Sequence, residues 1–190
     1  MDRTSQYPIN QLFLKRWSPR AMSGEVVTDE ELMTLFEAAR WAPSSYNLQP
    51  WRFLYAKKGS ANWDKFFGLM VEFNQSWAKN ASALVVIVSK KTFEHVEGPA
   101  ATHSFDAGSA WENLALQATD MGLVTHGMQG FDYDKAREVL NVPEDFAVEA
   151  MVVVGKPGKK EELPEGLQER EEASDRKPLS EIVMEGGFKK

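Results

Sequence analysis

Two uninterrupted apolar runs constrain the fold of this chain more than any other feature. Residues 83–89 (ALVVIVS) and 149–154 (EAMVVV) are rich in β-branched residues. A strand with one solvated face alternates apolar and polar residues, whereas a strand covered on both faces is continuously apolar. The two runs therefore predict buried strands in a sheet that carries helices on both faces.

Helical spacing predicts what covers the sheet. Thr28 and Glu31 have the spacing of a capping box, and Leu32, Leu35 and Ala39 follow at helical intervals, which predicts a helix over residues 28–41. We expect further helices over 8–15, 61–73, 103–121 and 132–140, the last capped by Asp132, and further strands over 51–56 and 124–129. Helices and strands are thus mixed along the chain, which predicts an α/β or α+β domain.

One apolar stripe and the C-terminal tail suggest contacts beyond this sheet. In the helix 103–121 a single stripe, facing the sheet or a partner subunit, is expected to comprise Phe105, Gly108, Trp111, Leu114, Ala115, Ala118 and Met121. Residues 155–175 are charged and contain Pro and Gly, which favours a mobile loop or an extended arm. Residues 176–188 become apolar again and need a surface to pack on, for which a second copy of the chain is an economical answer.

Length and composition limit the remaining choices. A chain of 190 residues is long enough for one domain with a real core and short for two, so we expect a single domain over 1–190. The formal charge of -6 argues against nucleic acid or an anionic membrane as partner. The chain has no Cys, its first residues lack an apolar signal region, and no apolar run approaches the ~20 residues of a membrane span. We therefore expect a cytoplasmic protein.

The common catalytic and metal-binding motifs are missing. His95, His103 and His126 lie 8 and 23 residues apart, without the close pairing that a metal site uses, so we expect no metal. The sequence contains neither Gly-x-Gly-x-x-Gly after its first strand nor a Gly-x-Ser-x-Gly elbow. We therefore expect a bound cofactor to supply the chemistry, and we expect Trp41, Met128 and Phe131 to pack in the core rather than line a substrate pocket.

Two polar segments remain as candidates for a cofactor site. Pro19 favours an extended backbone over 16–20, which would point Arg16, Ser18 and Arg20 to one side as a phosphate site, or as a solvated basic patch. The segment 43–51 (PSSYNLQPW) offers hydroxyl and amide groups that match the polar edge of a flavin or nucleobase, or that stabilise a turn by themselves.

Taken together, these motifs resemble the FMN-dependent nitroreductase family. The resemblance comprises Arg-x-Ser-x-Arg near the N-terminus, Pro-Ser-Ser-x-Asn-x-Gln-Pro-Trp after the first long helix, two glycines before Phe131, and Arg-Lys-Pro-Leu near the end, in order over essentially the whole chain. It implies an α+β fold with a central, mainly antiparallel sheet flanked by helices, in an intertwined homodimer with FMN at the subunit interface and the C-terminal tail packed on the partner. The chain departs from larger members in being compact between residues 86 and 105, and in carrying Gln129 where Glu is frequent.

The resemblance also implies which residues bind the cofactor. Arg16 and Ser18, with Arg176 and Lys177, would hold the FMN phosphate, and Arg20 would lie near the flavin N1 and O2. Ser44, Ser45 and Asn47 match a loop that lines the ring from the partner subunit, Asn74 matches an amide at the flavin edge, and the backbone of Gln129 and Gly130 would approach N5. Trp17 and Pro43 belong to the same motifs and complete the set of expected cofactor-binding residues.

The activity that this resemblance implies is ping-pong hydride transfer. NADH or NADPH would reduce the flavin at N5, and a small acceptor such as a nitroaromatic, quinone or enone would then be reduced in the same pocket, without a catalytic side chain. Three alternatives remain: a different flavin reaction on the same fold, such as reductive dehalogenation or flavin fragmentation; a non-catalytic flavin-binding or regulatory module; and an interaction protein without flavin.

Overall fold

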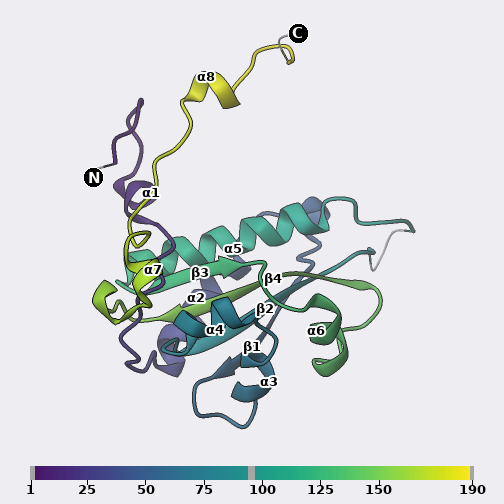
Figure 1. The fold of residues 1–190 in the computed structure, drawn as a ribbon. Helices are drawn as coiled ribbons and strands as arrows, with labels where there is room; N and C mark the ends of the chain where they lie inside the picture. The colour runs from purple at the N-terminus through teal and green to yellow at the C-terminus, as the bar shows by residue number, and fades with distance from the viewer. Residues whose placement is uncertain (1–2, 94–96, 189–190) are drawn as a thin grey trace.

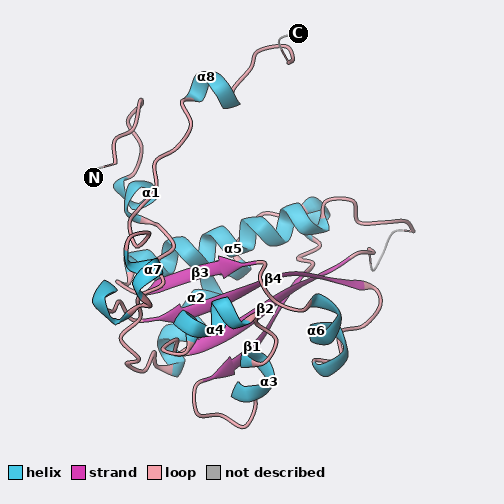
Figure 2. Cartoon of the chain, viewed as in Figure 1, coloured by secondary structure: helices cyan, strands magenta, loops and turns pink. Residues whose placement is uncertain are grey.

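The sheet is antiparallel and its two most apolar strands lie in the middle. The computed structural model describes residues 3–93 and 97–188, and within them four strands form one sheet in the order β1-β2-β4-β3 (Figures 1 and 2). The strands are β1 (Trp51–Lys57), β2 (Ala83–Lys90), β3 (Val124–Met128) and β4 (Phe146–Gly155). The predicted strand at 149–154 therefore begins earlier, at Phe146, where it pairs with Lys90 of β2.

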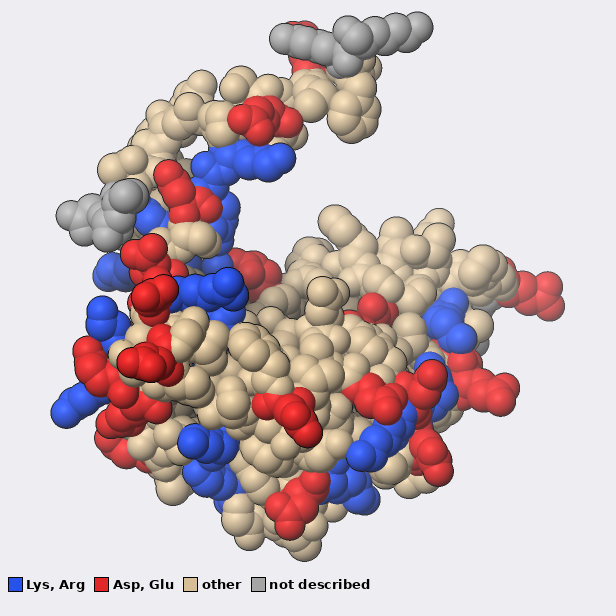
Figure 3. Space-filling view, viewed as in Figure 1, with Lys and Arg blue, Asp and Glu red and all other residues tan. Residues whose placement is uncertain are grey.

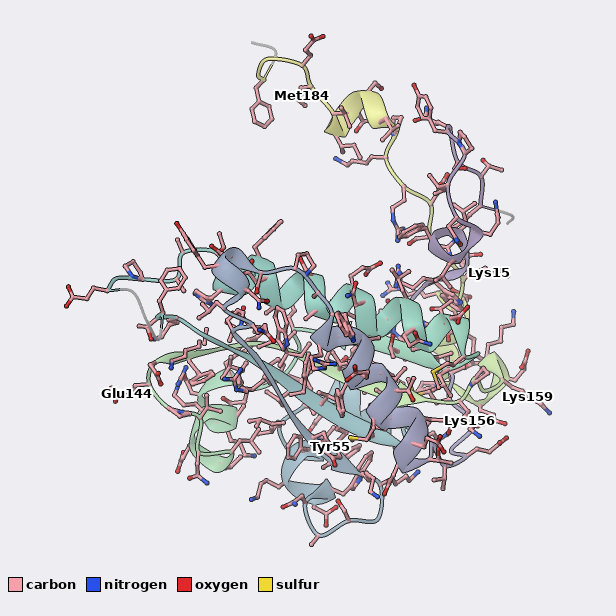
Figure 4. The ribbon with its side chains drawn as sticks, turned by 180° about the vertical axis from the view of Figure 1, so that it is seen from behind. Lys15, Tyr55, Glu144, Lys156, Lys159 and Met184 are labelled. Atoms are coloured by element: carbon pink, nitrogen blue, oxygen red, sulfur yellow. The ribbon has the colours of Figure 1, made fainter. Side chains whose placement is uncertain are left out.

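Helices cover both faces of the sheet, as the two apolar runs predicted. Along β2, Ala83, Val85 and Ile87 belong to one apolar core, and Leu84, Val86 and Val88 belong to the other. The first core is closed by α2 (Asp29–Arg40) and α5 (His103–Asp120), which lie side by side in the view from behind (Figure 4). The second is closed by α3 (Trp63–Phe67), α4 (Glu72–Ala78), α6 (Tyr133–Val139) and α7 (Glu165–Gln168). The predicted α+β class is thus confirmed.

The best-predicted helices begin where their capping residues stand. The hydroxyl of Thr28 accepts from the Glu31 backbone N–H at 3.1 Å, while the Glu31 carboxylate accepts from the Thr28 N–H at 2.7 Å. Asp132 caps α6 in the same way through the N–H of Lys135. The remaining short elements are α1 (Gln11–Lys15), the 3-10 turns η1 (Ser45–Asn47) and η2 (Lys160–Glu162), and α8 (Leu179–Ile182).

Two predicted segments differ from the structure. The helix expected over 61–73 is interrupted between α3 and α4, where Leu69 and Met70 enter the core and Met70 forms a bridge with Phe131. The arm expected over 155–175 lies against the body, because η2 and α7 place Leu163 and Leu167 in the second core. In both segments, burial of apolar side chains decides the backbone path over the local pattern.

Two aromatic residues, Trp41 and Phe105, are more exposed than the sequence predicted. Met128 and Phe131 are buried as predicted, but Trp41 is 72% exposed. In α5, Leu114, Ala115 and Ala118 face the sheet, whereas Phe105 lies on the opposite side and is 77% exposed. His95 lies outside the described residues.

The tail leaves the body and carries apolar side chains with it. The N–H of Leu179 donates to the side chain of Gln6 near the N-terminus. Beyond that point the chain stands clear of the body, with Met184 far from the sheet (Figures 1 and 4). The exposed apolar side chains of this tail are Leu179, Ile182, Val183, Met184 and Phe188.

Candidate functional site

The N-terminal basic segment lines a cavity at the base of the tail. The cavity has a volume of about 310 Å³ and is lined by Arg16, Trp17, Ser18, Arg20, His126, Arg170, Glu172, Ser174 and Arg176. Four arginines against one carboxylate make this a local positive site in a chain of charge -6. Lys and Arg side chains gather visibly where the tail leaves the body (Figure 3).

The extended path of residues 16–20 brings the predicted side chains together. The guanidinium of Arg16 donates to Oγ of Ser18 at 3.3 Å and lies 3.8 Å from the carboxylate of Glu112 on α5. Arg3 donates to the backbone carbonyl of Arg16 and fixes the start of the segment. Arg16, Ser18 and Arg20 therefore face one cavity, as the two-residue periodicity predicted.

A carboxylate from the far end of the sequence holds the other end of this segment. The backbone N–H groups of Arg20 and Ala21 both donate to Oε1 of Glu171, each at 2.7 Å. The side chain of Glu171 is only 4% exposed, and its Oε2 lies 4.0 Å from Nη1 of Arg20. Among the described residues, Oε2 of Glu171 and Nε of Arg20 are buried without a hydrogen-bond partner.

Trp77 connects the cavity to a second group of predicted residues. Its ring lies 4.8 Å from the ring of His126 and 6.0 Å from the guanidinium of Arg20. On its other side, Nε1 of Trp77 donates to Oδ1 of Asn74, and Nδ2 of Asn74 donates to the carbonyl oxygen of Gly130 at 2.9 Å. A continuous wall thus runs from the basic cavity to Gly130.

The environment of His126 in this wall disfavours its protonated form. Burial lowers the pKa of His126 below its ordinary value of 6.5, and the nearby charge of Arg20 lowers the pKa further. Its Nδ1 lies 3.3 Å from the carbonyl oxygen of Pro19. An imidazole held neutral here leaves the arginines as the cations that an anion would meet.

The loop 43–50 has a strained backbone. Tyr46, Asn47 and Gln49 all have φ near +50°, in the left-handed region that costs a non-glycine residue on the order of 1 kcal/mol or more. The Ser45 N–H donates to the carboxylate of Asp106 on α5 at 3.1 Å, and Oγ of Ser44 accepts from the Gln49 N–H. The buried Asp106 thus holds the loop in a conformation that its own residues disfavour.

The structure brings only part of the predicted set together. Arg16, Trp17, Ser18, Arg20 and Arg176 line the cavity, whereas Lys177 is exposed and pairs with Glu181. Asn74 and Gly130 are joined by a direct hydrogen bond, and Gln129 beside them is exposed. Pro43, Ser44, Ser45 and Asn47 lie near the opposite end of α5 and do not reach the cavity within one chain. Binding of FMN by these residues stays a prediction.

Several residues of the site were missed from the sequence. Asp106 did leave a signal, since it precedes the buried Ala110, Leu114 and Ala118 in steps of four. Glu171 and Trp77 left none, because Glu171 binds backbone N–H groups that are distant in sequence and Trp77 packs against the distant side chains of His126 and Arg20. No cluster of three or more metal-binding side chains occurs within 3–93 and 97–188. Over the same residues, no helix has the length and apolar character of a membrane span.

Known proteins are similar to this chain in sequence and in fold. The protein-family model described as "Nitroreductase family" matches residues 14–69 and 60–156 of this chain. A protein named NADH dehydrogenase from Thermus thermophilus is 26% identical, with 90% of this chain and 92% of that protein covered. A crystal structure described as "the oxidoreductase containing FMN" is 48% identical, with a TM-score of 0.94 over 98% of this chain and 96% of its own.

A nitroreductase family protein from Clostridium difficile shares the fold, with a TM-score of 0.72, 24% identity, and coverage of 94% of this chain and 98% of its own. Because the family model extends over most of the sequence, from residue 14 to residue 156, this chain belongs to the nitroreductase family.

Proposed function

We propose that this chain is an FMN-dependent oxidoreductase that uses NADH or NADPH, folds as one domain over 1–190 and works as a homodimer. The observation that carries the proposal is the cavity in which Arg16, Ser18, Arg20 and Arg176 converge. Support also comes from the similar structure described as an FMN-containing oxidoreductase and from the relative named NADH dehydrogenase.

The donor set of the cavity fits the phosphate of FMN. Guanidinium groups bind phosphate oxygens in bidentate fashion, and those of Arg16 and Arg176 enter the cavity from opposite ends of the chain. The buried Nε of Arg20 has no hydrogen-bond partner among the described residues, so a donor remains available in the wall of the cavity. The lining of the cavity therefore suits an anionic group with a polar ring attached.

Each part of the site has a separate task in this proposal. The phosphate of FMN would be held by Arg16, Ser18 and Arg176, together with Lys177 from the tail. Arg20 would place positive charge beside the flavin ring and so raise the midpoint potential of the flavin. When bound, FMN supplies hydride transfer from NADH or NADPH to a small acceptor such as a nitroaromatic, quinone or enone. The side chain of Asn74 fixes the carbonyl of Gly130, so the backbone at 129–130 presents a rigid edge.

The homodimer completes the site in this proposal. The loop with Pro43, Ser44, Ser45 and Asn47 does not reach its own cavity, and we assign it to the site of the second copy. The tail stands clear of its own body with its apolar side chains exposed (Figure 3), and a second copy offers the surface that these side chains lack. Exposed Trp41 and Phe105 are further candidates for this interface.

An absorbance spectrum of the purified chain, before and after anaerobic NADH or NADPH, tests the proposal. We expect flavin bands, either as isolated or after addition of FMN, and we expect them to bleach with one of the two nucleotides. Bands that persist would identify a non-catalytic flavin-binding module. A chain that takes up no FMN at all would overturn the proposal.

A further inference from the structure

Glu171 is a buried carboxylate that the proposed function does not use. Its side chain is 4% exposed, lies just after α7, and reaches residues 150 and 151 positions away in the sequence. A buried carboxylate with a poorly compensated charge is costly, and such groups are retained where they orient a neighbour or tune its charge. The question is which neighbour Glu171 serves.

The hydrogen bonds and the ion pair of the Glu171 side chain lead to the basic segment. Oε1 accepts the two N–H groups of Arg20 and Ala21, which fixes the backbone where the segment turns into the core at Ala21 and Met22. Oε2 faces the guanidinium of the same Arg20 at 4.0 Å, which is too long for a hydrogen bond. One carboxylate therefore holds the backbone of Arg20 and, separately, places a negative charge beside its side chain.

Arg20 depends on Glu171 for a negative charge that faces its guanidinium. Trp77, whose ring lies 6.0 Å from that guanidinium, supplies no negative charge. Glu172, the neighbouring acid, lines the open cavity instead. Glu171 is thus the carboxylate that pairs with Arg20 among the described residues.

We propose that Glu171 is a positioning residue of the cofactor site, which fixes Arg20 and moderates its positive charge toward FMN. The proposal rests on the proposed function for its cofactor, while the fixing of the backbone does not depend on it. Two properties follow that can be separated by substitution. Loss of the hydrogen bonds loosens residues 20 and 21, and loss of the charge makes Arg20 more positive.

Two variants separate these properties. Glu171→Ala removes the acceptor, so amide hydrogen exchange at Arg20 and Ala21 should accelerate by roughly tenfold or more in the chain without FMN. FMN should then bind about tenfold more weakly, because the segment must be ordered on binding. Glu171→Gln keeps an acceptor oxygen and removes the charge, so it should raise the midpoint potential of bound FMN without weakening FMN binding. Glu169→Gln, an exposed acid two residues away, should change none of these quantities.

A double-substitution cycle shows whether Glu171 acts through Arg20. In the Arg20→Ala background, Glu171→Gln should leave the midpoint potential unchanged, because the guanidinium that it moderates is gone. Unaltered exchange at residues 20 and 21 in Glu171→Ala, or an unaltered potential in Glu171→Gln, would overturn the proposal. If the wild-type chain binds no FMN, the proposed function fails, yet the exchange measurement still decides whether Glu171 fixes the segment.

Discussion

Replacing Gly130 by Ala tests the wall between the cavity and the 129–130 backbone. A Cβ at this position would lie 2.5 Å from Nδ2 of Asn74 and 3.3 Å from Cγ2 of Val71. Asn74 must then move and give up two hydrogen bonds, one to the Gly130 carbonyl and one from Nε1 of Trp77. Trp77 is 2% exposed, so its freed N–H stays away from water.

The size of the effect follows from these two bonds. A buried polar group left without a partner costs about 1–3 kcal/mol, so the loss of both bonds in Gly130→Ala should lower the free energy of unfolding by about 2–6 kcal/mol. Gly108→Ala is the matched control, because a Cβ there meets no atom within 4 Å inside α5. It should stabilise the chain by about 0.5–1 kcal/mol through helix propensity.

Urea unfolding followed by tryptophan fluorescence and circular dichroism at a fixed FMN concentration measures both variants. Asn74→Ala removes the clash in advance, so Gly130→Ala should cost less than about 1 kcal/mol in that background. Additive effects of the two substitutions, within about 0.5 kcal/mol, would refute the clash as the cause.

Four further predictions address other parts of the chain. Arg16→Ala should raise the dissociation constant of FMN roughly tenfold to a hundredfold by equilibrium dialysis, while the exposed neighbour Lys15→Ala should not; equal affinity would remove Arg16 from the phosphate site. Thr28→Ala should lower the free energy of unfolding by about 1 kcal/mol, since it breaks the capping box of α2; no change in urea denaturation would contradict that role. His126 has a folded-state pKa below its unfolded value of 6.5, so the unfolded chain takes up the proton first. The contribution of neutral His126 to the free energy of unfolding is complete above pH 6.5 and is lost as the pH falls through the lower folded-state pKa. His126→Gln should flatten this part of the pH profile, and an unchanged profile would show that His126 does not titrate there. Removal of residues 178–190 should convert a dimer into a monomer by light scattering, and a mass per particle that stays at two chains would assign the interface elsewhere.

Local chemistry made the core of the fold predictable. The capping box at Thr28 and the apolar run of β2 are complete within a few residues, and both elements occur where expected. Residues 61–73 have equally helical composition, but Leu69 and Met70 are drawn into the core, and that competition is decided by atoms elsewhere in the chain. The strained turn at 46–49 was likewise out of reach, since Asp106 holds it from α5.

In the candidate site too, residues placed by a local pattern were predictable, and residues placed by contacts distant in sequence were not. Arg16, Ser18 and Arg20 share a face because an extended backbone repeats every two residues, so their convergence was predictable. Glu171 binds backbone N–H groups, which every residue type presents alike, and no spacing in the sequence marks such a contact. A carboxylate that holds the backbone of a binding segment can therefore be identified only once the path of the chain is known.

The contact between Glu171 and Arg20 also has a consequence for biosynthesis. Its partners are 151 residues apart, and the cavity between them takes lining residues from both ends of the chain. Contacts of such long sequence separation form late, because a large loop must close first. On a ribosome the sheet and its helices can assemble as the chain emerges, but the basic cavity cannot exist until the segment around Glu171 has emerged as well. Under the proposed function, FMN therefore binds only after that segment has folded back onto residues 16–21.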